Sequence, residues 1–290
     1  MYRYTNISFP SLGIDIDPPR VLSLGPLNIH MYGLIIAFGL FLAAFYGMRR
    51  AKQFGVTEDH VLDGVLWVTP FAFVCARAYY CIFSWELYAD NPISVFYIWE
   101  GGIAIYGGVL GAVVGIIAFC KIKKISLGAT LDLVLLGFLI GQSIGRWGNF
   151  FNREAFGAET ESFLRMGLTD PLTGTTTYHH PTFLYESLWN ALGFLLLHKL
   201  SKKREYDGQI ALGYVVWYGL GRTFIEGLRT DSLYIPGTQL RVSQVLAAVS
   251  CLAAAGVLVY FILKPPAKPL FVNRVTENTN ETNEGGNEHA

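Results

Sequence analysis

One short stretch of the sequence gathers side chains that can bind an anion. In "GRWGNFFNREAFG", residues 145–157, Arg146 is followed by Asn149, Asn152 and Glu154, directly after the apolar run "LDLVLLGFLIGQSI". A guanidinium can bind two phosphate oxygens at once, and amide groups add further donors. A lone arginine at the end of an apolar membrane span could simply extend to the lipid head groups. That interpretation does not explain the amides and the carboxylate that follow. The stretch therefore predicts a site for a phosphate-bearing lipid.

A second polar group lies within a later apolar segment, "WYGLGRTFIEGLR". Tyr218, Arg222 and Glu226 follow one another at intervals of four residues, so they share one face of a helix. Charged groups inside a membrane helix are costly and usually face a cavity or a partner. The alternative is an Arg–Glu pair that only stabilises the helix, but such pairs add little stability in an apolar medium.

Three further stretches supply single candidates. Arg77 lies deep in the apolar "FVCARAYY", where it either contacts substrate or forms a structural ion pair. Tyr106 lies near the end of "WEGGIAIYGG", residues 99–108, which also contains Glu100. His180 and Glu186 belong to "HHPTFLYE" at the start of another apolar run, where a histidine is either a hydrogen-bonding anchor or a catalyst.

The composition is that of an integral membrane protein. Hydrophobic residues make up 52% and charged residues 15% of the chain, whereas soluble domains carry about 25% charged residues. The net charge is zero, which excludes a whole-molecule field for nucleic acid. The four cysteines show no CxxC spacing and no pairing with histidine, so no metal site is expected.

Apolar runs long enough to cross a bilayer predict an all-α membrane protein with seven transmembrane helices. These are expected at Leu27–Met48, Val61–Phe83, Gly102–Cys120, Ala129–Trp147, Thr182–His198, Gln209–Ile225 and Val242–Leu263. The basic clusters "RRAK", "KIKK" and "KLSKKR" follow the odd-numbered spans. Since cytoplasmic loops carry the excess of Lys and Arg, the N-terminus is expected outside and the C-terminus in the cytoplasm.

The chain is accordingly expected to hold one membrane domain, residues 1–264, with a functional external loop at about 148–180. Residues 265–290 are rich in Asn, Glu and Thr and predict a disordered cytoplasmic tail. Two series of glycines four residues apart predict close helix packing; they are Gly107, Gly111, Gly115 and Gly137, Gly141, Gly145.

The motifs resemble those of bacterial prolipoprotein diacylglyceryl transferases. "GRWGNFFNREAFG" is similar at every fixed position to the family signature Gly-Arg-x-Gly-Asn-Phe-x-Asn-x-Glu-x-x-Gly. Further similarities run to about residue 263 in "LGPLNIHMYGL", "WEGG…YGG", "HPTFLYE" and "YGLGRTFIEGLR". The resemblance implies a plasma-membrane transferase that moves diacylglyceryl from phosphatidylglycerol to the lipobox cysteine of a prolipoprotein and releases glycerol 1-phosphate, with no cofactor.

The resemblance also implies roles for individual residues. Arg146 would bind the lipid phosphate, with Asn149 and Glu154 completing that site. Tyr32 matches the tyrosine of the first-span motif, and Tyr218, Arg222 and Glu226 match the essential polar face of the sixth span.

One position departs from the family pattern. The third-span motif often reads His-Gly-Gly, but Tyr106 takes the place of that histidine. Tyrosine, with an ordinary pKa of about 10, is a poor base near neutral pH. Either the base lies elsewhere or none of the usual kind is needed. An inactive lipid-binding protein and a lipid transporter stay open as alternatives.

Overall fold

The computed structural model describes residues 4–25, 27–98, 101–230, 232–235 and 237–277. Seven long helices are present in this part of the chain: α1 (Met31–Arg50), α2 (Glu58–Phe83), α3 (Ile105–Lys123), α4 (Leu127–Asn152), α5 (Thr182–Ser201), α6 (Gln209–Ile225) and α7 (Val242–Leu263). Five of them, α1 to α4 and α7, are long and apolar enough to cross a membrane. The protein is therefore a mainly helical, multi-pass membrane protein.

The helix bounds follow the predicted spans closely, and α6 and α7 match them at both ends. The first predicted span was wrong at its start. Residues Leu27–His30 form strand β4, because apolar and polar side chains alternate in "LNIH" with the period of a strand. The helix α1 begins directly afterwards, at Met31.

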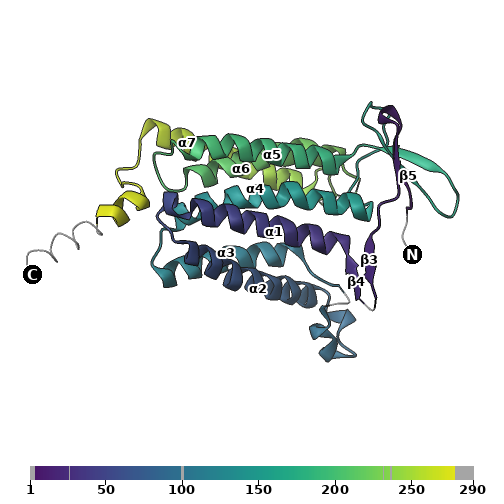
Figure 1. Ribbon diagram of the computed structural model, residues 1–290, viewed down its shortest axis with the longest axis horizontal. Helices are drawn as coiled ribbons and strands as arrows, with labels where there is room; N and C mark the ends of the chain where they lie inside the picture. Colours follow the sequence, from purple (N-terminus) through teal and green to yellow (C-terminus); the bar gives the residue numbers. More distant parts are fainter. Residues whose placement is uncertain (1–3, 26, 99–100, 231, 236, 278–290) are drawn as a thin grey trace, which may run out of the picture. The chain divides into compact units, whose positions relative to one another are not determined.

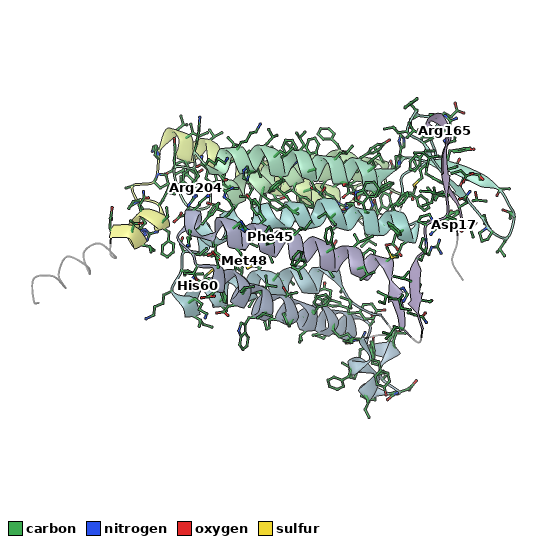
Figure 2. All side chains as sticks on the ribbon, viewed as in Figure 1. Asp17, Phe45, Met48, His60, Arg165 and Arg204 are labelled. Carbon is green, nitrogen blue, oxygen red and sulfur yellow. The ribbon has the colours of Figure 1, made fainter. Side chains whose placement is uncertain are left out.

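The chain forms two compact units, and α1 and α4 are divided between them. The first consists of Met1–Ala43 and Val134–Lys268, the second of Ala44–Leu133 and Pro269–Ala290. In the first unit, strands lie at one end of the helices (Figure 1). Figure 2 shows Asp17 and Arg165 at that end and Arg204 at the opposite end of the unit.

The first unit contains two small antiparallel sheets, which the all-α prediction missed. One has the order β2–β1–β5–β6, with β1 at Ile7–Phe9, β2 at Ile14–Ile16, β5 at Met166–Thr169 and β6 at Thr176–His179. The other pairs β3 (Val21–Leu24) with β4. Each strand has only three or four residues, too few for its pattern to stand out in the sequence.

The larger sheet packs its apolar face on the ends of α4 and α5. Ile7 of β1 and Leu168 of β5 are paired and fully buried. They belong to one core cluster with Phe150 of α4 and Phe183 of α5. This core fixes the loop between α4 and α5, which contains β5 and β6, over the helix end that carries the signature motif.

Both predicted glycine series are helix-packing seams. In the first unit, a Cβ on Gly39 of α1 would lie 3.4 Å from the Cα of Gly141 in α4. In the second unit, a Cβ on Gly107 of α3 would lie 2.3 Å from the Cβ of Tyr79 in α2. A larger residue would push these helix pairs apart.

Part of the predicted disordered tail is ordered. Residues 271–277 are helical, and a Cβ on Gly55 would lie 2.9 Å from atoms of Phe271 and Val272. The correction has a physical reason, because "LFVNRV" brings apolar side chains that can pack on the turn after α1. Residues 278–290 of the predicted tail lie outside the described residues.

Candidate active site

The signature motif begins inside a helix. The helix α4 continues to Asn152, five residues beyond the end predicted from the sequence. Arg146 and Asn149 are therefore three residues apart on one helix face, and Nη1 of Arg146 donates to Oδ1 of Asn149 at 3.3 Å. Glu154 accepts hydrogen bonds from the amides of Asn149 at 3.0 Å and Asn152 at 3.3 Å. Four of the predicted residues thus form one network.

A tight reversal after α4 brings Glu154 back over the helix end. Arg153 and Ala155 have φ angles of 55° and 54°, a region that residues other than glycine rarely adopt. Arg153 is 5% exposed and holds the turn in place, donating to the carbonyl oxygens of Phe151 and Pro18 at 2.9 Å and pairing with Asp17. Burial lowers the pKa of Arg153, which the nearby Asp17 partly offsets.

Glu186 of α5 joins the arginines of the site. Its Oε2 forms an ion pair with Arg146, and its Oε1 lies 3.4 Å from Nη1 of Arg222 and 3.5 Å from Nη1 of Arg229. The Glu186 side chain is only 7% exposed. One buried carboxylate is therefore the shared partner of three guanidinium groups.

Glu226 holds Arg222 from the other side. The helix α6 ends at Ile225, so Glu226 stands at its C-terminal end, and its Oε2 lies 2.7 Å from Nη2 of Arg222. Ser243 at the start of α7 donates to Oε1 of Glu226 at 2.6 Å. Burial alone would raise the pKa of Glu226, but the Ser243 hydrogen bond and the Arg222 charge outweigh it and lower that pKa. Glu226 is thus held as a carboxylate.

The cluster concentrates guanidinium groups. Among the described contacts, Arg146, Arg222 and Arg229 pair with Glu186 and Glu226, and a third carboxylate, Glu154, is linked to Arg146 through Asn149. The arginine side chains are 23%, 18% and 11% exposed, so they are largely removed from water but still open to a ligand. Charges in such surroundings need compensation. The site is therefore suited to an additional anion.

Two tryptophans, one on α5 and one on α6, pack these helices together. The rings of Trp189 and Trp217 stack with centroids 4.3 Å apart, and each indole N–H donates to the other residue's carbonyl oxygen, at 3.0 and 2.9 Å. Gly193 and Gly221 leave room for the rings, since a Cβ on either would lie 2.2 Å from an indole nitrogen. This contact fixes the two helices that carry Glu186 and Arg222.

The structure places three more predicted residues in the first unit. Tyr32 lies at the start of α1 with its ring against Gly148, one residue before Asn149. Tyr218 is one turn before Arg222 and stacks on Tyr214 at 5.7 Å. His180 lies 3.4 Å from the Tyr185 hydroxyl through Nδ1, and its carbonyl accepts from Gly157 N–H at 2.9 Å.

Arg77 and Tyr106 belong to the second unit. Arg77 donates to five backbone carbonyl oxygens, those of Ser94, Val95, Tyr97, Gly101 and Gly102. Within the described residues, these carbonyls take the place of the carboxylate that a structural ion pair would supply. The alternative that Arg77 contacts substrate stays a prediction. Tyr106 is the second residue of α3 and is 43% exposed. Glu100 lies outside the described residues.

Sequence reasoning underrated several residues. Glu186 was noted only as a neighbour of His180, although a carboxylate inside an apolar span is a signal in itself. Ser243 and Arg241 were missed. Arg241 donates to the carbonyl oxygen of Glu226. Both stand at the start of α7, where polar residues usually only mark the end of a span.

Comparison with known proteins agrees with this site. A family model described as prolipoprotein diacylglyceryl transferase matches residues 19–260. The chain belongs to this family. The matched region includes every residue of the arginine and carboxylate cluster.

Several bacterial members of the diacylglyceryl transferase family are similar over most of their length. The phosphatidylglycerol–prolipoprotein diacylglyceryl transferase of Bacillus velezensis is 42% identical over 252 residues, which cover 85% of this chain and 93% of the relative. The protein of the same name from Shouchella clausii is 45% identical over 253 residues, 84% of this chain and 91% of the relative. The protein of the same name from Listeria monocytogenes serotype 4b is 41% identical over 265 residues, which cover 88% of this chain and 95% of the relative.

Proposed function

We propose that this transferase moves the diacylglyceryl group of phosphatidylglycerol to the thiol of the lipobox cysteine in prolipoproteins. One observation carries the proposal. Arg146, Arg222 and Arg229 gather around the single carboxylate of Glu186 at a site that is largely removed from water. This concentration of guanidinium groups can bind an anionic phospholipid head group. The names of the relatives, phosphatidylglycerol–prolipoprotein diacylglyceryl transferases, support the same pair of substrates.

The reaction needs a stabilised leaving group. The cysteine sulfur attacks the glycerol CH2 next to the phosphate, an S–C bond forms, and the C–O bond to the phosphate breaks. The electron pair of that bond stays on the phosphate oxygen, so glycerol 1-phosphate leaves as an anion. Preorganised donors directed at such developing charge are a main source of rate enhancement. Arg146 and Arg222 are assigned this role, with Asn149 and Asn152 as further donors.

The attacking sulfur must lose its proton. A free thiol has a pKa of about 8.5, and nearby cations lower it. The guanidinium groups of the cluster favour the thiolate of the bound substrate. Glu186 and Glu226 orient the arginines, whereas Glu154 binds the amides of Asn149 and Asn152.

The proposal includes a membrane orientation. All seven helices cross the plasma membrane of a bacterium, with the N-terminus outside and the C-terminus in the cytoplasm. The basic clusters after α1, α3 and α5 support this arrangement. It places the arginine cluster at the external face, where a signal peptide embedded in the bilayer can present its cysteine.

The test is a transfer assay with purified protein, phosphatidylglycerol and a lipobox peptide, in which Arg146→Ala and Arg165→Ala are compared with the wild type. Arg165 is the matched control because it lies on the external loop, stacked over Tyr178. Arg146→Ala is expected to fold, since Arg222 and Arg229 still compensate Glu186. We expect the wild type and Arg165→Ala to transfer the diacylglyceryl group, and Arg146→Ala to show no transfer. Full activity of folded Arg146→Ala would refute the assignment, and phosphatidylglycerol binding without transfer by any variant would favour an inactive binding protein.

A further inference from the structure

An apolar segment of the second unit follows α2 and lies outside the helical spans. Residues 85–98, here called the 85–98 segment, contain two short 3₁₀ helices, η3 (Trp85–Leu87) and η4 (Pro92–Phe96). The chain leaves α2 at Phe83 and enters α3 at Ile105. In Figure 1 the segment projects from the end of the α2–α3 pair. Because α2 and α3 are both apolar enough to cross a membrane, this end lies at a bilayer surface.

The segment exposes large apolar side chains. Five of them are more than half exposed: Trp85 (54%), Leu87 (70%), Ile93 (66%), Phe96 (75%) and Ile98 (60%). Single exposed apolar residues are common on protein surfaces, but a concentrated group marks an interaction surface. Next to the end of a transmembrane helix, the apolar medium available to such a group is the lipid.

The backbone of the segment is partly hydrogen-bonded within its short turns. The N–H groups of Leu87, Tyr88, Asn91, Ser94 and Tyr97 each donate to a carbonyl oxygen three residues earlier. Unsatisfied backbone groups are excluded from the hydrocarbon interior because no water can replace their partners. The segment is therefore suited to the bilayer surface, where water reaches its remaining backbone groups, and not to the hydrocarbon interior.

Arg77 fixes the segment from within. Its guanidinium donates to the carbonyl oxygens of Ser94, Val95 and Tyr97 in the segment, and the ring of Tyr88, which is 7% exposed, lies 5.2 Å away. The same guanidinium also donates to the carbonyl oxygens of Gly101 and Gly102, just before α3. The buried cation thus joins the apolar segment to the chain that leads to Tyr106.

We propose that the 85–98 segment lies in the bilayer surface, with its five exposed apolar side chains among the acyl chains, and that Arg77 couples it to the start of α3. Arg77 is then a positioning residue for Tyr106 rather than a residue that binds the phosphate. The inference goes beyond the proposed transfer reaction. It requires only that α2 and α3 cross the membrane.

The test places the photoreactive residue p-benzoylphenylalanine at Phe96 in the full-length protein, in vesicles of phosphatidylglycerol and phosphatidylethanolamine. Its matched control carries the same residue at Leu172, which is 76% exposed in the turn between β5 and β6, among polar neighbours. After irradiation, intact-protein mass spectrometry measures lipid adducts. We expect at least tenfold more adduct at position 96 than at 172. Equal yields, or adducts with the mass of a protein or peptide at position 96, would overturn the proposal.

A second variant tests the role of Arg77. Arg77→Lys keeps the charge but cannot reproduce the fork of donors that reaches five carbonyl oxygens. In Arg77→Lys we expect the adduct yield at position 96 to fall at least threefold. For the transfer reaction of the same variant, we expect the fold decrease in kcat to exceed the fold increase in KM. An unchanged adduct yield would overturn the coupling. The adduct yield does not depend on the transfer reaction, so an inactive wild type would refute the proposed function and leave this measurement valid.

Discussion

The carboxylate of Glu186 in α5 forms an ion pair with the guanidinium of Arg146 in α4, although their side chains are only 7% and 23% exposed. The same carboxylate also faces Arg222 and Arg229. Removing the charge of one member of a buried ionic group typically costs about 3–5 kcal/mol, because the partners lose their compensation. Neutralising Glu186 therefore removes the shared partner of three arginines in one substitution, and is the most direct test of the electrostatics of the site.

We expect Glu186→Gln to lower the midpoint of thermal unfolding in detergent and to make the protein more responsive to anions. Without the Glu186 carboxylate the three arginines lose their shared partner, so a bound phosphate compensates more of their charge. Inorganic phosphate or glycerol phosphate should raise the unfolding temperature of Glu186→Gln more than that of the wild type. Equal shifts in a thermal titration would contradict this account of the cluster.

We expect Gly148→Ala to reduce both stability and transfer. The new Cβ would lie 2.7 Å from Cδ2 of Tyr32, so the ring and the start of α1 must move. Overpacking of this kind costs about 1–3 kcal/mol, and a misplaced site costs roughly tenfold to a hundredfold in rate. Gly256→Ala in α7 is the control, because its Cβ would meet nothing within 4 Å. Thermal unfolding and the transfer rate should separate the two variants; similar behaviour would argue against the Tyr32 contact.

Ser243→Ala should shift the acid sensitivity of the protein. The pKa of Glu226 is lowered in the fold, so its carboxylate contributes stability above its ordinary pKa, and this contribution is lost as the pH falls through the lowered value. Without the Ser243 hydrogen bond that pKa rises, and the acid loss should begin at a higher pH.

The measurement is the unfolding temperature as a function of pH for Ser243→Ala and Ser250→Ala. Ser250 is the control because it also lies in α7 but donates to the carbonyl oxygen of Ala247. Acid profiles that coincide for the two variants would show that Ser243 does not support the Glu226 carboxylate.

Tyr106→Phe is expected to keep partial transfer activity, within about tenfold of the wild type, because tyrosine is a poor base near neutral pH and its hydroxyl is expected to donate a hydrogen bond and not to remove a proton. Loss of general acid–base catalysis typically costs about 10²–10⁴ in rate. Steady-state kinetics with phosphatidylglycerol binding measured in parallel provide the check. Total loss of transfer with intact lipid binding would instead indicate proton transfer through Tyr106.

The sequence located most of the helices. Apolar run length located α6 and α7 to the residue, and four-residue spacing placed Arg222 and Glu226 on one helix face, where the structure pairs them. Local periodicity carries this information because both residues belong to one helix end.

Contacts between distant segments were not predictable in the same way. The pairing of Arg146 with Glu186 depends on how α4 packs against α5. Arg77 donates to backbone carbonyl oxygens, and because every residue has such an oxygen, the sequence does not identify these partners. The short strand β1 pairs with β5 far along the chain, and no local pattern encodes that partner.

The pairing of the N-terminal strand has a consequence for biosynthesis. Thr5 and Thr169, which are hydrogen-bonded, are 164 positions apart in the sequence. β1 is synthesised well before β5, so the four-stranded sheet cannot close until the polypeptide beyond α4 has been made. During that interval β1 can pair with β2, but its other edge lacks its partner strand β5. Closure of the sheet over Phe150 and Phe183 is therefore a late step of assembly, and the signature motif gains its final geometry only after most of the chain has been synthesised.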